Sequence, residues 1–193
     1  MDTPFRIIML VGLLGIIPIG LYHRIKANTD EKLDRQQEGW FVLLTLRPIA
    51  LIRMIAMICW LCSPALLAWS AMPLPLAIRW FGVAVGVTAA LLLVWTFVTL
   101  GTNITDTVVT RREAFLVTNG PYRWVRHPFY LAFGLGVTAD TLATANWFLG
   151  ITGLITFAVI VLRTKREEEN LIARFGDEYR SYMTRSGRFL PFA

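Results

Sequence analysis

Charged residues are scarce in this 193-residue chain, where they make up 17% of the sequence, against about 25% in an ordinary soluble domain. The shortage is concentrated in long stretches that lack Asp, Glu, Lys and Arg, apart from Asp140 in the last: 7–23, 54–78, 80–105 and 127–162. Hydrophobic residues reach 55%, and the mean hydropathy is +0.55. Such stretches are typical of membrane spans, so the pattern excludes an ordinary soluble domain and predicts an all-α integral membrane protein.

Cysteine is nearly absent, and the two present, Cys59 and Cys62, form a C-x-x-C inside an apolar stretch. A redox or metal role needs polar surroundings or further ligands. Neither lies nearby in the sequence, so we interpret both as small apolar residues of a membrane helix and predict no metal site. A G-x-G-x-x-G motif after a strand is also lacking, which argues against a Rossmann nucleotide fold. Without repeats or linkers, we expect residues 1–193 to form a single domain.

The apolar stretches predict five transmembrane helices. A span needs about 20 apolar residues, so the first three stretches are interpreted as single crossings within 1–100. The stretch 127–162 is too long for one crossing and is flanked by Arg126 and Arg163. Two crossings in a tight helical hairpin satisfy both its length and its flanking charges. The hairpin turn is expected at four polar residues: Asp140, Thr141, Thr144 and Asn146.

Basic residues predict the orientation in the membrane. Most of the 19 Lys and Arg lie in 24–35, 111–126 and 163–188. The positive-inside rule therefore places the N-terminus outside and the C-terminus in the cytoplasm. Arg6 and Arg79 fall on the outer side and are the exceptions. Arg47 and Arg53 lie near the inner end of the second span, from which they could snorkel to the surface. Because the charge follows the membrane loops, no nucleic-acid partner is expected, and the bilayer is the main partner.

Two polar segments, 101–126 and 163–193, lie on the same predicted side and are joined by the hairpin. We therefore expect them to meet and to form any aqueous site in the region 101–193. Within the second segment, 164–183 is predicted to form a cytoplasmic amphipathic helix, because apolar residues recur at helical spacing: Leu171, Phe175, Tyr179 and Tyr182.

Two clusters carry groups capable of chemistry. His127 stands at a water–lipid boundary just before Pro128, which suits a first helical turn. Such a histidine could be only an interface residue. Arg163 and Glu167 are four residues apart and share one helical face, which could reflect a structural salt bridge. An acidic group this close to hydrocarbon needs a partner, and a cationic ligand would be one.

Together the clusters show a family pattern. The first reads Arg126-His127-Pro128-Phe129-Tyr130. The second contains Glu167-Glu168, Leu171, Phe175-Gly176, Tyr179 and Tyr182, followed by Gly187-Arg188-Phe189-Leu190-Pro191. In this order, the two motifs resemble those of the isoprenylcysteine carboxyl methyltransferase family, which is related to phospholipid methyltransferases. The resemblance covers about residues 98–192.

The resemblance implies binding of S-adenosyl-L-methionine, with S-adenosyl-L-homocysteine as the product, at the cytoplasmic face. It assigns the cofactor contacts to Ala114, Phe115, Leu116, Val117, Tyr122, His127, Pro128, Phe129, Tyr130 and Glu167. It assigns the catalytic roles to Arg163 and Glu167, with Arg163 facing the substrate. Ala132 and Ala114 depart from residues that the family often has there. The implied location is the plasma membrane in a prokaryote or the endoplasmic reticulum in a eukaryote.

The expected function is methylation of a lipophilic substrate, with the carboxylate of a prenylated cysteine favoured as acceptor. That carboxylate is already ionised and needs no base. One alternative is the amino group of a phospholipid, which must lose a proton to a base such as Glu168 or His127. Another is a membrane reductase using NADPH, whose 2′-phosphate would be bound by Arg111 and Arg112.

Overall fold

The computed structural model describes residues 2–26, 40–101 and 115–191, and these residues form helices and connecting segments without a β-strand. The elements are α1 (Thr3–Lys26), α2 (Trp40–Cys62), the 3-10 helix η2 (Pro64–Ser70), α3 (Leu76–Leu100), the 3-10 helix η4 (Gly120–Arg123), α4 (Pro128–Thr144), α5 (Trp147–Phe175) and α6 (Asp177–Met183). The predicted all-α fold is confirmed for the described part of the chain.

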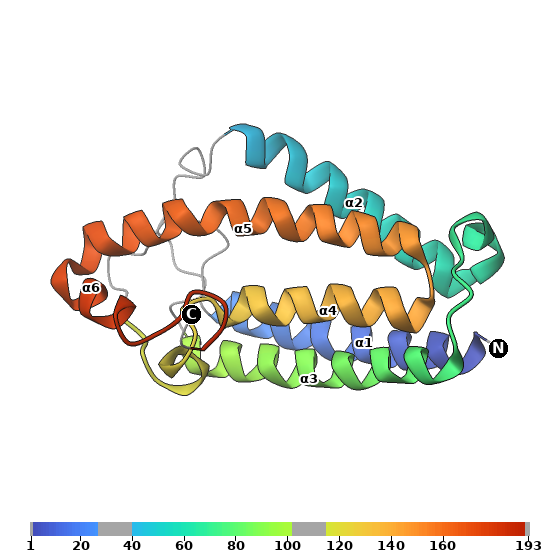
Figure 1. Ribbon diagram of the computed structural model, residues 1–193, viewed down its shortest axis with the longest axis horizontal. Coiled ribbons are helices and arrows are strands. Elements are labelled where there is room, and N and C mark those ends of the chain that lie inside the picture. Colours follow the sequence, from blue (N-terminus) through green and yellow to red (C-terminus); the bar gives the residue numbers. More distant parts are fainter. Residues whose placement is uncertain (1, 27–39, 102–114, 192–193) are drawn as a thin grey trace.

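The helices form a bundle in which α1, α3 and α4 lie alongside one another, while α5 runs beside α2 (Figure 1). The most extensive packing is between α3 and α4. It requires a small residue at Gly82, because a Cβ there would stand 2.7 Å from Cβ of Leu142. Close packing of this kind is common between membrane helices, whose association depends on van der Waals contact.

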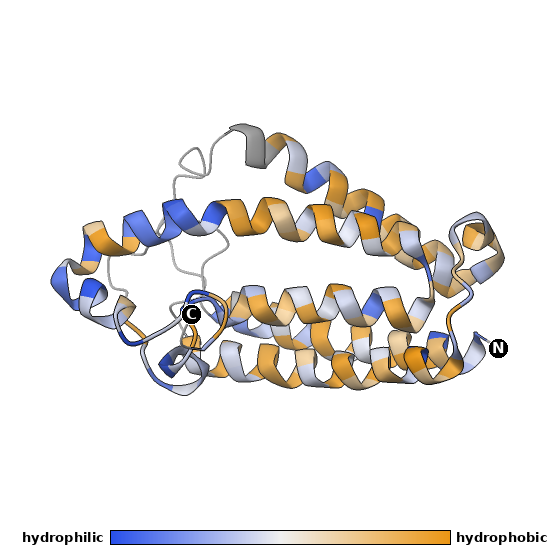
Figure 2. Cartoon of the chain, viewed as in Figure 1, coloured by the Kyte–Doolittle hydropathy of each residue, from blue (hydrophilic) through white to orange (hydrophobic). Residues whose placement is uncertain are grey.

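Within the described residues, four helices are long and apolar enough to cross a membrane: Thr3–His23, Leu44–Cys62, Leu76–Leu100 and Trp147–Phe175. Apolar residues cover these helices, whereas hydrophilic ones gather on the last turns of α5 and on α6 (Figure 2). The chain is therefore a multi-pass membrane protein. Helix α4 has 17 residues and is not among the four, so the count of five spans stays a prediction.

The second span lies earlier in the chain than its apolar stretch predicts. Helix α2 ends at Cys62, and the following residues form η2 and a turn before α3 begins at Leu76. Pro64 explains the break, because it cannot donate a hydrogen bond and favours an extended residue before it. Ser63 is extended accordingly, with φ −155° and ψ 113°.

The predicted tight hairpin joins α4 and α5 through Ala145 and Asn146. The backbone of Ala145 adopts the left-handed helical conformation, with φ 49°. Asn146 caps α5, since its side-chain oxygen accepts a hydrogen bond from the Leu149 N–H at 3.1 Å. Its amide donates to Ser70 Oγ at 2.8 Å, which ties the hairpin to η2. Asp140, Thr141 and Thr144, which the sequence places in the turn, lie within α4 instead.

Helix α5 continues well beyond the apolar stretch. The sequence predicts an amphipathic helix over 164–183, and the structure forms these residues into two helices, with α5 running unbroken to Phe175 and α6 following it. Nothing at 163–164 interrupts the backbone, whereas Gly176 does, because it ends α5 with φ 56°. A positive φ suits glycine, which has no Cβ. The polar turns of α5 are thus a rigid extension of the last span.

Arginine side chains hold the hairpin end of the bundle, the end with the α4–α5 turn. Arg53 binds Asp140 and the Leu149 carbonyl, so it does not snorkel to the surface: an acidic partner lies within the bundle. Arg79 donates to the Ala143 carbonyl at 3.0 Å and pairs with Asp2 at 2.8 Å. Arg6 donates to the Leu61 carbonyl at 2.8 Å.

Candidate functional site

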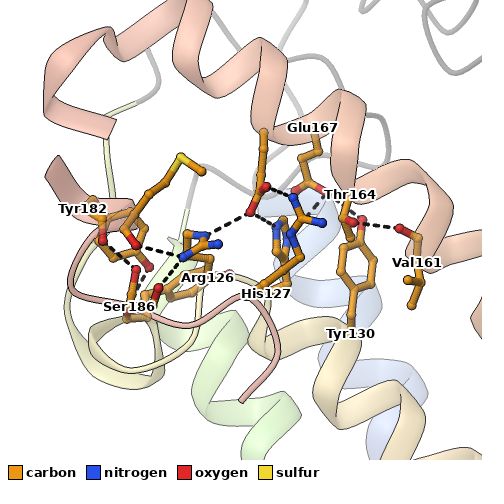
Figure 3. Close-up of polar contacts among 12 residues, drawn as sticks. Arg126, His127, Tyr130, Val161, Thr164, Glu167, Tyr182 and Ser186 are labelled. Atoms are coloured by element: carbon orange, nitrogen blue, oxygen red, sulfur yellow. Dashed lines mark hydrogen bonds and ion pairs between the residues drawn. The ribbon is translucent and has the colours of Figure 1, made fainter. Parts of the chain in front are cut away.

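The opposite end of the bundle holds a cluster of polar side chains, and we call it the site end. Three parts of the chain meet there: the residues that lead into α4, the polar extension of α5, and the C-terminal segment 184–191 (Figure 3). They meet because α5 projects past the start of α4. The predicted convergence of the two polar segments is therefore seen for their described residues.

Glu168 is the centre of this cluster. Its side chain is 4% exposed. Its Oε1 accepts a hydrogen bond from Arg126 Nε at 2.9 Å and lies 3.2 Å from His127 Nε2, while its Oε2 pairs with Arg188. A buried carboxylate is tolerated only when it is paired and hydrogen-bonded. Glu168 meets that condition with partners from two other parts of the chain.

Backbone pairing fixes the C-terminal segment against the residues before α4. The Arg126 N–H donates to the Gly187 carbonyl at 2.8 Å, and the His127 N–H donates to the Arg188 carbonyl at 3.1 Å. In return, the Gly187 N–H donates to the Trp124 carbonyl at 3.0 Å. Arg126 adds side-chain bonds to the same segment, to the carbonyls of Met183 and Ser186. The end of the chain is thereby part of the site.

The imidazole of His127 is buried, with 3% of the side chain exposed. It stacks on Tyr130, with ring centroids 5.3 Å apart and an interplanar angle of 27°, and it contacts the ring of Phe189 at 5.8 Å. His127 is the residue before α4, and Pro128 begins the helix, as the sequence predicts. This position holds the ring at the helix start, where the C-terminal segment covers it.

Glu167 has different surroundings from its neighbour Glu168. Its side chain is 30% exposed. Its Oε2 accepts a hydrogen bond from the Tyr130 hydroxyl at 2.7 Å, and His127 Nδ1 lies 3.8 Å from the same oxygen. The carboxylate is thus oriented by aromatic neighbours and still open to a ligand.

Tyrosines extend the cluster toward the η4 turn. The Tyr182 hydroxyl donates to the Tyr122 carbonyl at 2.6 Å, which ties α6 to η4. Burial, together with the negative charge of Glu167, raises the pKa of the Tyr122 hydroxyl well above its usual value. Burial also raises the pKa of Tyr182, to about 12. Both phenols therefore stay neutral, and Tyr122 supplies ring surface near Glu167.

Among the predicted site residues, the structure brings His127, Tyr130 and Glu167 into direct contact and places Tyr122 close to Glu167. Pro128 is buried beside them. Arg163 lies one turn before Glu167 on α5, close enough for its charge to act on the Tyr130 hydroxyl.

The remaining predicted residues lie less centrally. Phe129 is 38% exposed, and its ring contacts Phe97 on α3 and Tyr130. Phe115 is 62% exposed, Leu116 is half-buried and Val117 is buried. Ala114, Arg111 and Arg112 fall outside the described residues.

Sequence reasoning missed the roles of Arg126, Arg188 and Glu168. The available signal was the paired glutamates: two adjacent carboxylates on a helix face different directions, and the one facing the protein needs cations. The structure also argues against Glu168 as a base for an amine acceptor, because both of its oxygens already have positively charged or N–H partners.

The fold and this cluster define the class: a helical membrane protein with a site where an extended last helix meets the start of the preceding one. The comparisons then identify the family it resembles. The model of the isoprenylcysteine carboxyl methyltransferase family matches residues 82–173, which confirms the resemblance seen in the sequence. The matched range holds His127, Tyr130, Glu167 and Glu168, but not the C-terminal segment.

Curated relatives support the same resemblance. A methanethiol S-methyltransferase of Mycobacterium tuberculosis is 37% identical over 71 residues, which is 37% of this chain and 28% of that protein. The human protein-S-isoprenylcysteine O-methyltransferase is 33% identical over 97 residues, which is 49% of this chain and 34% of that protein. The alignments thus span about a third or less of these relatives' own length.

A solved structure shows a similar fold. The eukaryotic intramembrane Ras methyltransferase, an isoprenylcysteine carboxyl methyltransferase, superposes with a TM-score of 0.54 over 76% of this chain and 52% of its own, at 24% sequence identity. At this identity the likeness concerns the fold. It agrees with the all-helical membrane architecture described above.

Proposed function

We propose that this protein is an S-adenosyl-L-methionine-dependent methyltransferase that acts on a lipophilic acceptor at the membrane–water boundary. The observation that carries the proposal is the cluster of His127, Tyr130 and Glu167 at the polar end of the last span. The family match over residues 82–173 supports it. We further propose the orientation that the basic residues favour, with the N-terminus outside and the site in the cytoplasm.

The residues present fit such a cofactor. S-Adenosyl-L-methionine carries a sulfonium and an ammonium group, both of which are cationic, and an adenine ring. The partly exposed carboxylate of Glu167 can bind a cationic group, and the aromatic rings of Tyr122, Tyr130 and His127 provide surfaces for cation–π and stacking contacts. Glu167 is held by the Tyr130 hydroxyl at 2.7 Å, so the anion is already oriented.

The cofactor supplies the methyl group when it is bound. Transfer from a sulfonium is an in-line displacement in which positive charge disappears, so the reaction gains from alignment and from exclusion of water. We assign alignment to Glu167 and the aromatic rings, and acceptor binding to Arg163, whose guanidinium can hold one oxygen of a carboxylate while the other attacks. The covered ring of His127 and the buried Glu168 leave little room for bulk water on that side.

The favoured acceptor is the carboxylate of a prenylated cysteine or a similar lipid. The family match supports this choice, and an acceptor with an apolar chain can reach the site from the bilayer. A second candidate acceptor is a small thiol, which the likeness to the mycobacterial methanethiol S-methyltransferase favours. A thiol must lose its proton before it attacks, and His127 and Glu167 are the groups that could accept it.

Two measurements test the proposal. Isothermal titration of S-adenosyl-L-homocysteine into purified protein in detergent should show binding, and Glu167→Ala should weaken it by roughly tenfold or more through loss of a charged partner. Glu169→Ala is the matched control, because Glu169 lies two positions later on the same helix and is exposed. A folded preparation that binds no S-adenosyl-L-homocysteine would contradict the proposal.

Transfer of labelled methyl from S-adenosyl-L-methionine then separates the acceptors. Product from a farnesylated cysteine analogue with a free carboxylate, and none from methanethiol, would select the favoured acceptor. The reverse result would select the thiol. Replacement of Arg163 by Met should lower the rate with the carboxylate far more than with the thiol, since only the carboxylate uses the guanidinium.

A further inference from the structure

Three consecutive glutamates on α5 lie in three different surroundings. Glu167 is 30% exposed and faces Tyr130. Glu168 is 4% exposed and is bound by Arg126, His127 and Arg188. Glu169 is exposed. The difference follows from helix geometry, because successive side chains point about 100° apart. Of the three, only Glu168 is buried.

We infer that Glu168 is a positioning residue, which holds His127 in one orientation and one tautomer and fastens the C-terminal segment over the imidazole ring. The consequence for methyl transfer rests on the proposed function. The orientation itself rests on contacts between described residues and can be tested without a ligand.

The first step of the argument concerns the proton on His127. Glu168 is flanked by two guanidinium groups, those of Arg126 and Arg188, so its carboxylate is ionised and can only accept hydrogen bonds. The ring nitrogen that faces it, His127 Nε2, at 3.2 Å from Oε1, must therefore carry the proton. In a neutral imidazole the other nitrogen then has the lone pair.

The second step concerns what this arrangement offers a ligand. His127 Nδ1 faces Glu167 Oε2 at 3.8 Å, which is too long for a direct hydrogen bond. Both atoms are acceptors when the ring is neutral, so a donor placed between them could bind both. An ammonium group is a donor of this kind, and the proposed cofactor carries one. Glu168 thus selects the chemistry of a site that it does not itself line.

The third step concerns the C-terminal segment. Arg188 joins Glu168 to the same segment that carries Phe189, whose ring lies 5.8 Å from that of His127. Arg126 binds the opposite oxygen of Glu168 and the Ser186 carbonyl. One carboxylate therefore connects α5, the start of α4 and the end of the chain, and its loss should loosen the cover over the ring.

The tautomer can be observed directly by nitrogen NMR of the protein labelled at histidine. The chain has 2 histidines, His23 and His127, so His23→Gln assigns the spectrum. Recorded where the ring is neutral, the wild type should show His127 protonated at Nε2 and bare at Nδ1. Glu168→Gln should shift it toward a mixture, because the amide can also donate. Glu169→Gln should leave it unchanged. A ring protonated at Nδ1, or spectra identical in wild type and Glu168→Gln, would overturn the inference.

Binding of S-adenosyl-L-homocysteine gives the second readout. Glu168→Gln should weaken it by roughly tenfold, because a smaller fraction of the molecules then has the binding-competent orientation and tautomer of His127, and Glu168→Asp should recover part of that loss. Arg188→Ala is a second variant that should still fold, because the Arg188 side chain is 43% exposed. It should also loosen the contact between the C-terminal segment and the His127 ring. Unchanged affinity in both Glu168→Gln and Arg188→Ala would contradict positioning by Glu168.

The two readouts distinguish failure of this inference from failure of the proposed function. If the wild type binds no S-adenosyl-L-homocysteine but shows the Nε2–H tautomer that depends on Glu168, the proposed cofactor is wrong and the positioning role stands. If the wild type binds S-adenosyl-L-homocysteine but the tautomer of His127 is the same in Glu168→Gln, the proposed cofactor stands and the positioning role of Glu168 is wrong.

Discussion

The two ends of the bundle use arginine for different purposes. At the hairpin end, Arg6 and Arg79 donate to backbone carbonyls near the ends of α2 and α4. At the site end, Arg126 and Arg188 converge on the carboxylate of Glu168. The first use satisfies carbonyls that a helix end leaves without partners. The second stabilises the buried carboxylate of Glu168, which in turn contacts His127.

This difference shows where a ligand can be accommodated. In the described residues of the hairpin end, the acids Asp2 and Asp140 each pair with an arginine. At the site end, Arg126 and Arg188 pair with Glu168. The carboxylate of Glu167 is partly exposed, and it lies next to the Tyr130 hydroxyl and the His127 imidazole. The site end is therefore the place where we propose that a cationic ligand binds.

The largest effect is expected for Arg126→Ala. The change removes a cation from a carboxylate that is 4% exposed and also removes bonds to the Met183 and Ser186 carbonyls. Breaking a buried ion pair costs about 3–5 kcal/mol, so the unfolding temperature in detergent should fall steeply. Arg123→Ala, three residues earlier at the end of η4 and exposed, is the control and should change little. Equal effects of the two would mean that Glu168 is not a structural centre.

A smaller effect is expected for the ion pair of the hairpin end. Asp140 is 25% exposed, so its pairing with Arg53 is less enclosed than that of Glu168. Asp140→Ala should destabilise the protein by about 2 kcal/mol, and adding Arg53→Met should recover part of that loss, because the uncompensated charge is then gone. Arg47→Met, at an exposed position of the same helix, serves as control. Strictly additive effects in the double-mutant cycle would show that the pair is not coupled.

The cap made by Arg6 should contribute less again. Arg6→Ala removes hydrogen bonds to the Leu61 and Cys62 carbonyls at the end of α2. A cost of about 1–2 kcal/mol is expected from lost charged hydrogen bonds at a partly buried position. Arg6→Lys should restore part of it, because the ammonium can still donate. If binding of S-adenosyl-L-homocysteine changed as well, the two ends could not be regarded as independent.

The smallest effect concerns alkaline pH at the site end. Burial raises the pKa of Tyr182 from 10.0 to about 12. The folded state thus prefers the neutral phenol, so its stabilisation is complete below pH 10 and is lost as the pH rises toward 12. In Tyr182→Phe the unfolding temperature should be lower at neutral pH, for want of the bond to the Tyr122 carbonyl, and should fall less between these pH values. Tyr22→Phe, at an exposed position, should match the wild type throughout.

The sequence permits prediction of much of the fold, for definite reasons. Long runs without charge predict spans because hydrocarbon cannot solvate ions, and the length of 127–162 with its flanking arginines predicts the hairpin. The errors came from backbone details. Ser63 and Pro64 end α2 inside an apolar run, and α5 continues past Arg163, because hydropathy is insensitive to where a helix breaks.

Composition and the spacing of charged residues are properties of the chain itself, so they suffice to predict helices, membrane spans and polar segments on one side. Which glutamate is enclosed and which is open depends instead on how the helices pack. That choice depends on the direction in which α5 meets Arg126, His127 and Arg188, residues distant in the chain or on other elements. The surroundings of a charged group are set by its neighbours in space. Two glutamates that are adjacent in the sequence can therefore differ, one buried and paired and the other partly exposed.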